Sequence, residues 1–417
     1  MPRVRIRHTL MVLAATGCCF WVIGLSARVA LSKIFITYAA KMGNLAAANE
    51  SVRLAPSDAE SHFVRAEVLK FSGAANDALA ELERAVALRP RDYYLWLELG
   101  LTRDELDDHA GALVAFNKAV DLAPYYAQPR WQRGNLLLRN GQFNEAFADL
   151  RRAAGSNPDL LPNVMDLAWG VSRQDAKLTE QLAGISSERG RLMFAQFLAS
   201  RGNASDALAQ FRTVKDVSQE ARHKLVEQLI ADWSFEEAFA VWSDSEAGTR
   251  VQALTVQDGS FEGSLGFGAA GFSWDISRSI PAVKMALDAS HPHSGLKSLQ
   301  VEFRGEPPAD RLMLSQLILV EPSGKYRLNF AARTQELVTG SLPLMVINDA
   351  RDKSMRLGAS APLGQGTRDW QVFTFEFTAG PETRAVVLSL RREICQTQPC
   401  PIFGSVWLDS FSIQLVQ

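Results

Sequence analysis

Residues 93–124 read YYLWLELGLTRDELDDHAGALVAFNKAVDLAP, and this stretch is one period of a repeated pattern. Its final proline belongs to a series spaced 34 residues apart: Pro56, Pro90, Pro124 and Pro158. Small and large apolar residues keep the same spacing in four more columns: Ala78, Ala112 and Ala146; Ala85, Ala119 and Ala153; Leu82, Phe116 and Leu150; Ala66, Gly100 and Gly134. Such a period is typical of helix–turn–helix units that stack around a common core. We therefore predict an α-solenoid.

The repeated stretch resembles the tetratricopeptide repeat (TPR) family. The residues that carry the resemblance are Trp96, Leu99, Gly100, Ala112, Phe116, Ala119 and Pro124. The best repeats cover residues 59–158. Beyond Pro158 the period is lost, but paired apolar helices continue, which predicts diverged repeats over 159–246. The resemblance implies a scaffold rather than a particular ligand.

In the resembled family the first helix of each unit lines a concave surface that binds a protein partner. Carrying that register onto this chain gives a candidate groove made of residues from three units. Trp131 is the strongest candidate, because aromatic and arginine anchors dominate binding energy. The alternative is that Trp131 packs against a neighbouring repeat. The candidate groove residues are Phe63, Lys70, Tyr94, Leu97, Trp131, Asn135 and Arg139.

The N-terminus combines a basic tail, residues 1–8, with an uncharged apolar stretch, residues 9–27. At 1.5 Å per helical residue, this stretch spans most of a bilayer's roughly 30 Å hydrocarbon core. Arg3, Arg5 and Arg7 should stay in the cytoplasm. We therefore predict a single-pass bacterial inner-membrane protein with a cytoplasmic N-terminus and a periplasmic or otherwise extracytoplasmic bulk.

Two other interpretations of the N-terminus remain open: a cleaved signal peptide, and a lipoprotein processed at Cys18. The solenoid is predicted over residues 28–246. Projecting its period backwards places a first repeat helix at 25–40, which overlaps the end of the apolar stretch. One helix would then leave the bilayer and become the first repeat helix.

Bulk composition excludes some classes of function. The chain has 417 residues, 22% of them charged, and a net charge of −2, so nothing electrostatic favours nucleic acid. Hydrophobic residues make up 47%, which does not indicate disorder. The length suggests two or three domains, each able to bury its own core.

Residues 250–417 change from helical spacing to short alternating segments separated by Gly and Pro. Examples are residues 298–303, 326–330, 372–377 and 386–390. This spacing predicts an antiparallel β-sandwich. The whole chain is thus expected to be a multidomain α plus β protein with a transmembrane helix, a solenoid and a sandwich.

This second half resembles the jelly-roll carbohydrate-binding modules of the cellulose- and xylan-binding type. The resemblance rests on segments 258–262, 293–299, 326–333 and 407–409, together with Trp274. It implies binding of a glycan through aromatic side chains and adjacent polar groups. The alternative is a structural or protein-binding jelly roll, because Phe373, Phe375 and Phe377 are expected in the core. The candidate glycan residues are Trp274, Arg327, Asn329, Arg333, Trp370 and Arg391.

Two pairs of residues in this half suggest structural bonds. Cys395 and Cys400 enclose a proline-containing turn, which suits a disulfide in a non-cytoplasmic compartment. Zinc is the alternative, but further ligands are missing nearby. In the resembled family, acidic residues at the places of Glu262 and Asp409 often help hold a structural calcium ion. The alternative for this pair is two turn-capping carboxylates.

No catalytic residue is singled out. Gly266–Gly271 matches a dinucleotide-binding pattern but lacks the strand before it and the helix after it. We therefore predict a non-enzymatic envelope scaffold: the groove recruits a protein, and the β domain holds a glycan or a second protein, in assembly or export of a surface polysaccharide. The alternative is a polysaccharide-modifying hydrolase or lyase with its site in the β domain.

Overall fold

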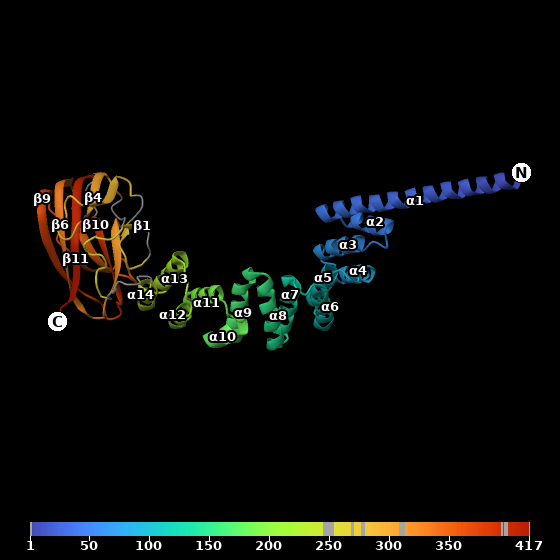
Figure 1. The fold of residues 1–417 in the computed structure, drawn as a ribbon, viewed down its shortest axis with the longest axis horizontal. Coiled ribbons are helices and arrows are strands. Elements are labelled where there is room, and N and C mark those ends of the chain that lie inside the picture. Colours follow the sequence, from blue (N-terminus) through green and yellow to red (C-terminus); the bar gives the residue numbers. More distant parts are fainter. Residues whose placement is uncertain are drawn as a thin grey trace. The chain divides into compact units, whose positions relative to one another are not determined.

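The computed structural model describes residues 2–244, 254–267, 271–276, 280–307, 313–392, 395 and 399–416, with side chains described for residue 13 and from residue 15 onwards. The chain divides into two compact units, Met1–Gly184 and Ile185–Gln417. The first unit is helical, and the second contains four helices followed by strands (Figure 1). The predicted boundary between solenoid and β domain, at 246–250, lies outside the described residues.

Helices of the first unit follow the sequence period closely. Each proline of the 34-residue series lies just after a second helix of a pair, and the two helices of each pair pack against each other. The elements are α1 (Pro2–Met42), α2 (Leu45–Leu54), α3 (Ala59–Phe71), α4 (Ala75–Leu88), α5 (Tyr93–Glu105), α6 (His109–Leu122), α7 (Ala127–Arg139), α8 (Phe143–Ser156), the 3-10 turn Pro158–Leu160, α9 (Leu161–Val171) and α10 (Ala176–Ala183).

The small columns of the period mark the places where paired helices approach most closely. Gly100 on α5 faces the ring of Phe116 on α6, and a Cβ atom at position 100 would lie 2.5 Å from that ring. Gly134 has the same relation to Leu150 on α8, at 2.9 Å. The predicted TPR-like α-solenoid is therefore confirmed, and its small residues are explained by helix contact.

One polar contact recurs in three successive units. A side chain in the first turn of the first helix reaches back to the carbonyl oxygen of the proline six residues earlier. The pairs are His62 Nε2 with Pro56 O at 2.9 Å, Trp96 Nε1 with Pro90 O at 2.9 Å, and Arg130 Nε with Pro124 O at 3.0 Å. This contact ties each proline turn to the helix that follows it.

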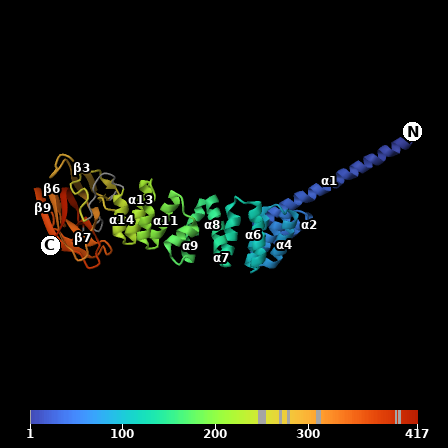
Figure 2. The ribbon, with the colours of Figure 1, turned by 60° about the horizontal axis from the view of Figure 1, so that its bottom comes forward.

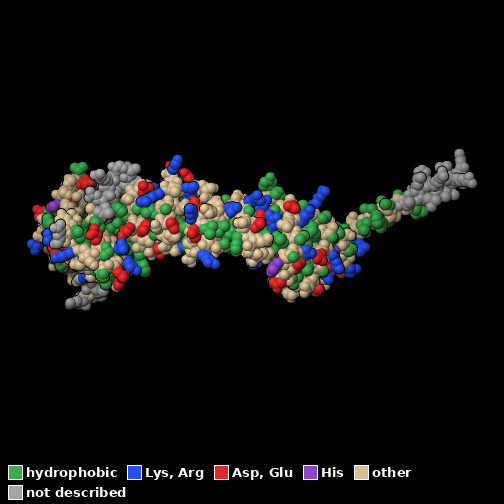
Figure 3. All heavy atoms as spheres, turned by 90° about the horizontal axis from the view of Figure 1, so that it is seen from below, with side chains coloured by type: hydrophobic (Ala, Val, Ile, Leu, Met, Phe, Trp, Pro, Cys, Tyr) green, Lys and Arg blue, Asp and Glu red, His purple; other side chains and the backbone are tan. Residues whose placement is uncertain are grey.

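Helix α1 is continuous from the apolar stretch into the repeats (Figure 2). Its C-terminal part is packed, because Ser32, Ile36 and Ala39 are buried. Ser32 Oγ donates a hydrogen bond to Ser51 O at 3.0 Å, which joins α1 to α2. Its preceding part is exposed, and Figure 3 shows hydrophobic side chains along the described portion that projects from the repeats.

Among the described residues, Ala15–Met42 is long and apolar enough to cross a membrane, with a mean hydropathy of 1.7. An N-terminal helix of this kind serves either as a membrane span or as a signal sequence. Lys33, which lies within this segment, forms ion pairs with Asp58, at 3.1 Å, and with Glu60. About the last three turns of the helix therefore belong to the repeats.

The second unit begins with two more helix pairs. These are α11 (Glu188–Ser200) with α12 (Ala204–Phe211), and α13 (Gln219–Ala231) with α14 (Phe235–Ser243). The buried residues Phe194, Ala207 and Phe211 fill the first pair. Helical pairs thus continue to Ser243, as the apolar patterning beyond Pro158 predicts.

The strands of the second unit form two sheets. Their bounds are β1 (Gly266–Phe267), β2 (Asp275–Ile276), β3 (Val283–Asp288), β4 (Ser298–Gly305), β5 (Leu314–Leu319), β6 (Lys325–Thr339), β7 (Pro343–Asp349), β8 (Arg356–Ala359), β9 (Gly366–Thr378), β10 (Ala385–Arg392) and β11 (Ile402–Leu415). One sheet has the order β1-β2-β5-β10-β7-β8 and the other β3-β4-β11-β6-β9. All described pairings are antiparallel except β1 with β2.

A single apolar core draws side chains from both sheets. Tyr326, Leu328 and Phe330 of β6 belong to it together with alternate residues of β10, such as Leu388. Phe375 and Phe377 are buried in this core, and Phe373 packs against it. The predicted antiparallel β-sandwich is confirmed.

Candidate functional site

Side chains link the first helices of successive repeat units across α3, α5 and α7. We call this surface the first-helix face. The ring of Phe63 on α3 contacts that of Tyr94 on α5 edge-on, with centroids 5.7 Å apart. Asp104 on α5 and Arg139 on α7 form an ion pair. Residues that lie about one period apart in the sequence therefore meet on one surface.

Charges on this face are concentrated around Lys70. Its Nζ lies 3.1 Å from Glu98 Oε2 and 3.5 Å from Glu67 Oε1. Burial alone would lower the pKa of Lys70, but the hydrogen bond to Glu98 and the charges of Glu98, Glu67 and Glu105 raise it. The lysine is therefore charged at neutral pH and is outnumbered by carboxylates.

Tyr94 is the aromatic residue most directly coupled to this cluster. It is 39% exposed. Burial and the negative charge of Glu98, to which it is hydrogen-bonded, raise the pKa of the Tyr94 phenol. It is therefore a neutral hydrogen-bonding group at physiological pH, with one part of its ring available to a partner.

The remaining predicted groove residues divide into surface and core. Trp131 is half-buried, and its carbonyl oxygen accepts a hydrogen bond from Asn135 Nδ2 at 2.8 Å. Leu97 is fully buried in a cluster with Phe116 and Leu136, so it has no surface to offer a partner. Phe116 of α6 and Leu136 of α7 share the cluster that covers Leu97, which explains this placement.

Sequence reasoning missed several residues of the first-helix face. Glu98 and Asp104 lie on it as ion-pair partners, and they could have been found by looking for opposite charges about one period apart. Tyr125 and Tyr126 were also missed. They are 87% and 58% exposed, and the Tyr126 ring lies 4.9 Å from that of Tyr93.

In the sandwich, the five-stranded sheet carries three of the predicted glycan residues on its polar face. Arg327 Nη2 is 2.8 Å from Glu376 Oε1, and Asn329 accepts a hydrogen bond from Thr374 at 2.8 Å. The guanidinium of Arg333 lies over the ring of Trp407, 5.5 Å from its centroid. Alternation along β6 puts these three residues on one side of the sheet.

Aromatic and imidazole rings border the same sheet face. Trp370 on β9 lies 5.2 Å from the ring of His293, and Trp407 on β11 lies 5.1 Å from that of His291. Asp288 fixes the second pair, because it contacts His291 Nδ1 at 2.8 Å and accepts from Trp407 Nε1 at 2.7 Å. Burial alone would raise the pKa of Asp288, but these hydrogen bonds and those from Ser290 lower it to about 2.

The other two predicted glycan residues lie elsewhere. Trp274 is buried, stacks on Phe261 at 5.1 Å and donates its Nε1 hydrogen to Asp258 O at 3.0 Å. Arg391 belongs to β10 in the other sheet, and its Nε donates to Ser389 Oγ at 3.1 Å. Neither residue joins the face formed by Arg333 and its neighbours.

Glu262 and Asp409 both hold the loop before β4. Glu262 Oε1 accepts from the backbone N–H groups of Leu296 and Lys297, at 2.7 and 3.1 Å. Asp409 is fully buried, and its Oδ2 accepts from the N–H groups of His293 and Ser294. These contacts match the turn-capping alternative. No group of three His, Cys, Asp or Glu residues that could hold a metal occurs within the described ranges, and the calcium site stays a prediction.

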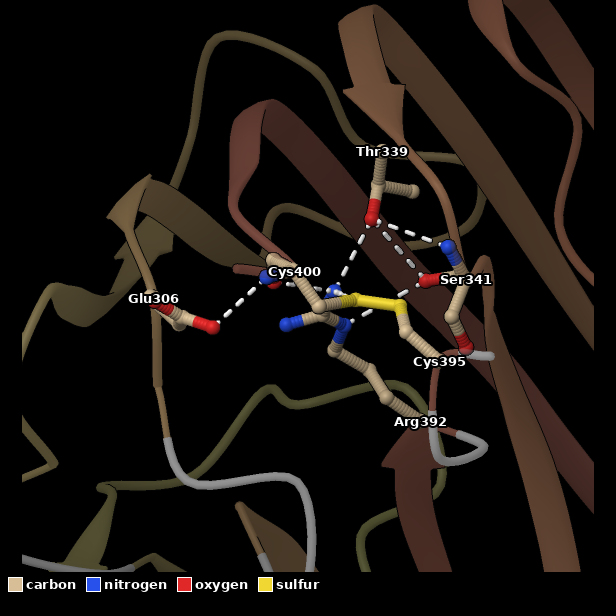
Figure 4. The surroundings of a disulfide bond; sticks show 6 residues. All are labelled: Glu306, Thr339, Ser341, Arg392, Cys395 and Cys400. Atoms are coloured by element: carbon tan, nitrogen blue, oxygen red, sulfur yellow. Dashed lines mark hydrogen bonds between the residues drawn. A yellow bond between two sulfur atoms is a disulfide. The ribbon is translucent and has the colours of Figure 1, made fainter. Parts of the chain in front are cut away.

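A disulfide joins Cys395 and Cys400 next to the end of β10 (Figure 4). Arg392 lies beneath it, almost fully buried, and donates to Cys400 O at 3.0 Å and to Thr339 Oγ1 at 2.9 Å. Glu306 accepts from the backbone N–H of Cys400 at 2.6 Å. Burial lowers the pKa of Arg392, and Glu306 offsets part of that cost. The predicted disulfide thus closes a tip that is held from two strands.

Comparisons with known proteins fit the helical half. The tetratricopeptide repeat family model matches residues 93–126 and 127–160. Curated relatives include DnaJ homolog subfamily C member 3 from Bos taurus and from Homo sapiens, each 30% identical over 101 residues. That segment is 24% of this chain and 20% of the relative, so the chain spans a fifth of the curated proteins it matches.

Similar solved structures share little sequence with the chain. MamA from Desulfovibrio magneticus RS-1 is 18% identical, with 37% of this chain and 90% of that chain covered and a TM-score of 0.34. The Pseudomonas aeruginosa PilF structure is 19% identical, covering 48% and 99%, also at 0.34. A structure from work on CBM4 is 15% identical, covering 39% and 99%, at 0.30. TM-scores of this size do not establish a common fold. From the family match and the repeat geometry together, the chain contains tetratricopeptide repeats, matched at residues 93–160, and carries a C-terminal antiparallel β-sandwich.

Proposed function

We propose that this protein is an envelope scaffold anchored in a bacterial inner membrane by α1, with its repeats and sandwich outside the cytoplasm. The first-helix face binds a protein partner. The sandwich binds a glycan, or a second protein, during assembly or export of a surface polysaccharide. Tetratricopeptide repeats generally mediate protein–protein interaction, and such arrays typically act as scaffolds rather than enzymes.

The observation that carries the protein-binding part is the run of linked side chains on the first-helix face. Phe63 and Tyr94 offer ring surface, while Lys70, Glu98 and Arg139 offer charges already held in place. Preorganised aromatic and charged groups lower the entropic cost of binding. Helical repeats present extended concave surfaces of this kind to their partners.

The test is capture of the native partner by the full chain with Trp131→Ala and Arg139→Ala combined. We expect the variant to lose capture while its melting temperature changes little, because Trp131 is only half-buried and Arg139 is exposed. Val114→Ala on α6 is the matched control, since Val114 is 61% exposed on a second helix. A folded double variant that still captures the same partner would refute the groove assignment.

Glycan binding by the sandwich is supported by Arg333 and Trp370 on the five-stranded sheet and by His293, whose ring lies beside that of Trp370. Rings can stack on the C–H face of a sugar, while guanidinium and amide groups bind its hydroxyls. A glycan-array screen of the full chain tests this part. We expect Arg333→Ala to lose the wild-type signals and Arg391→Ala, on the other sheet, to retain them. If Arg333→Ala keeps all the wild-type signals, any glycan site lies away from this face.

A further inference from the structure

The turn between the two helices of each repeat pair has a residue with a positive φ two positions before the second helix begins. At most of these positions the residue is glycine or a polar residue. Before α14 it is Trp233, with a φ of 60° and a side chain that is 52% exposed. The other positions are Gly43, Gly73, Asp107, Gly141, Gln174 and Gly202.

A tryptophan is a costly residue for this turn. The left-handed region is reached freely by glycine, but a bulky side chain there is strained. Exposure to water means that burial of the ring does not repay the strain of Trp233. Strained residues of this kind cluster at ligand-binding sites. The turn itself therefore gives no reason for tryptophan at position 233.

Loops of the sandwich lie beside this ring, within the same compact unit, Ile185–Gln417. The guanidinium carbon of Arg351, after β7, lies 4.6 Å from the centroid of the Trp233 ring. Arg384, before β10, pairs with Glu236 of α14 at 2.8 Å. Charged donors and acceptors are therefore placed around an exposed aromatic ring.

The loops that carry these arginines are held from below. Asp349 Oδ1 accepts from the backbone N–H of Arg351 at 2.7 Å and from that of Asp352 at 3.1 Å. Thr383 donates its hydroxyl hydrogen to the other oxygen of Asp349, which is itself buried. The two loops that carry Arg351 and Arg384 are thus joined through Asp349.

These groups line a pocket of about 240 Å³, formed by Asp232, Trp233, Phe235, Arg351, Glu382 and Arg384. Pockets for drug-sized ligands are roughly 300–1,000 Å³, so this one suits a ligand of a single ring. Its two arginines and two carboxylates balance in charge, which does not select a strongly charged ligand. Acceptors and donors around an aromatic ring match the hydroxyls and C–H face of a sugar.

We propose that this pocket is a binding site for one pyranose ring of a glycan. The C–H face of the ring stacks on Trp233. The hydroxyls donate to the carboxylates of Asp232 and Glu382 and accept from Arg351 and Arg384. The site is separate from the five-stranded sheet face and does not depend on glycan binding there.

The test uses the full chain, labelled with 5-fluorotryptophan, in a detergent without a sugar headgroup. Methyl glucoside, methyl galactoside, methyl mannoside, N-acetylglucosamine and methyl glucuronide are added separately. Saturation transfer from protein to sugar reports binding. The fluorine resonance that is absent from the spectrum of Trp233→Gly is assigned to Trp233. We expect at least one sugar to receive saturation transfer and to shift that resonance with a saturable dependence on concentration.

Trp233→Gly is the decisive variant, because glycine suits the turn and should leave the melting temperature equal or higher. We expect it to lose saturation transfer, whereas Trp370→Ala on the sheet face keeps it. Arg351→Gln should raise the dissociation constant obtained from the fluorine titration about tenfold, as expected for loss of a charged hydrogen bond. No response to any of the five sugars, or an equal response in Trp233→Gly, overturns the proposal. A response lost only in Trp370→Ala would support the sheet face instead and also overturn this pocket.

Discussion

At the scale of single residues, three different side chains make the same contact with the proline turn. His62, Trp96 and Arg130 each place a ring or guanidinium nitrogen about one hydrogen-bond length from a proline carbonyl. The equivalent residue after Pro158 is Val164, whose side chain has no hydrogen-bond donor. The 34-residue period ends at the same place. The contact therefore helps define how far the regular repeats extend.

Gly100→Ala should destabilise the repeats, because the new Cβ would lie 2.5 Å from the buried ring of Phe116. Overpacking of this kind costs about 1–3 kcal/mol. Gly155→Ala is the control, since no heavy atom lies within 4 Å of its Cβ position on α8. Urea unfolding followed by circular dichroism should show a lower midpoint only for Gly100→Ala. Equal midpoints for the two variants would mean that α5 and α6 can separate at no cost.

The sandwich should lose stability in acid through Asp288. Its pKa is lowered from 3.8 to about 2 in the folded protein, so the carboxylate stabilises the fold above the unfolded pKa. That contribution, roughly 2 kcal/mol, is lost as pH falls from about 4 to 2. Thermal unfolding of wild type and Asp288→Asn at pH 7, 4 and 2 measures it. The two proteins should differ at pH 7 and converge at pH 2, and a constant difference would contradict this assignment.

At the scale of elements, the residue type at one position on the first helix of a unit corresponds to the residue type at one position on the second helix. His62 on α3 lies 2.6 Å from the buried Glu81 on α4, and Arg130 on α7 lies 3.0 Å from the buried Asp149 on α8. In the unit between them, Trp96 packs near Ala115. Histidine or arginine on the first helix is thus paired with a carboxylate on the second, whereas tryptophan is paired with a small apolar residue.

Glu81→Ala alone should cost roughly 3 kcal/mol, because it leaves buried polar partners without their carboxylate. Combining it with His62→Trp recreates the pair that the next unit already uses. We expect the double variant to regain more than half of the loss in urea unfolding. If the double variant is as unstable as the sum of the single variants, the units are not interchangeable at these positions.

Sequence patterns predicted the elements well where packing is periodic and poorly where it depends on a neighbour. The proline, alanine and glycine columns were sufficient to predict α3 to α8. Leu97 was expected in the groove, but Leu136 of the next unit belongs to the cluster that buries it. The partnership of Lys70 with Glu98 was likewise missed, because it joins two units. Trp274 was expected near a ligand, yet a backbone carbonyl binds its indole hydrogen in the core.

At the scale of the whole molecule, the chain carries its binding candidates in two compact units, Met1–Gly184 and Ile185–Gln417. The first contains the apolar helix and the first-helix face. The second contains the sheet face and the pocket at Trp233. Sequence alone could assign the repeat and sandwich folds, but it could not bring Trp233 to Arg351, which lie more than a hundred residues apart.

Orientation in the membrane can be tested on intact spheroplasts. With Arg3, Arg5 and Arg7 inside, externally added protease should digest both compact units. The measurement is immunoblotting with antibodies to residues 185–417, with a cytoplasmic protein as the control. Protection of that region, or release of a shortened soluble form without protease, would contradict the anchored topology.

In the proposed membrane-anchored arrangement, the continuity of α1 determines how the repeats face the membrane surface. The same helix reaches Ser32 and Ile36, which are packed among the repeats. A rotation of α1 about its axis therefore turns the repeats with it. One alanine inserted before Val29 would turn the buried stripe by about 100° and lift it by about 1.5 Å relative to the span. Seven inserted residues would return it to within about 20° of its original direction. In the proposed membrane-anchored arrangement, the number of residues between the lipid and the first repeat therefore sets the direction in which the first-helix face points around the membrane normal.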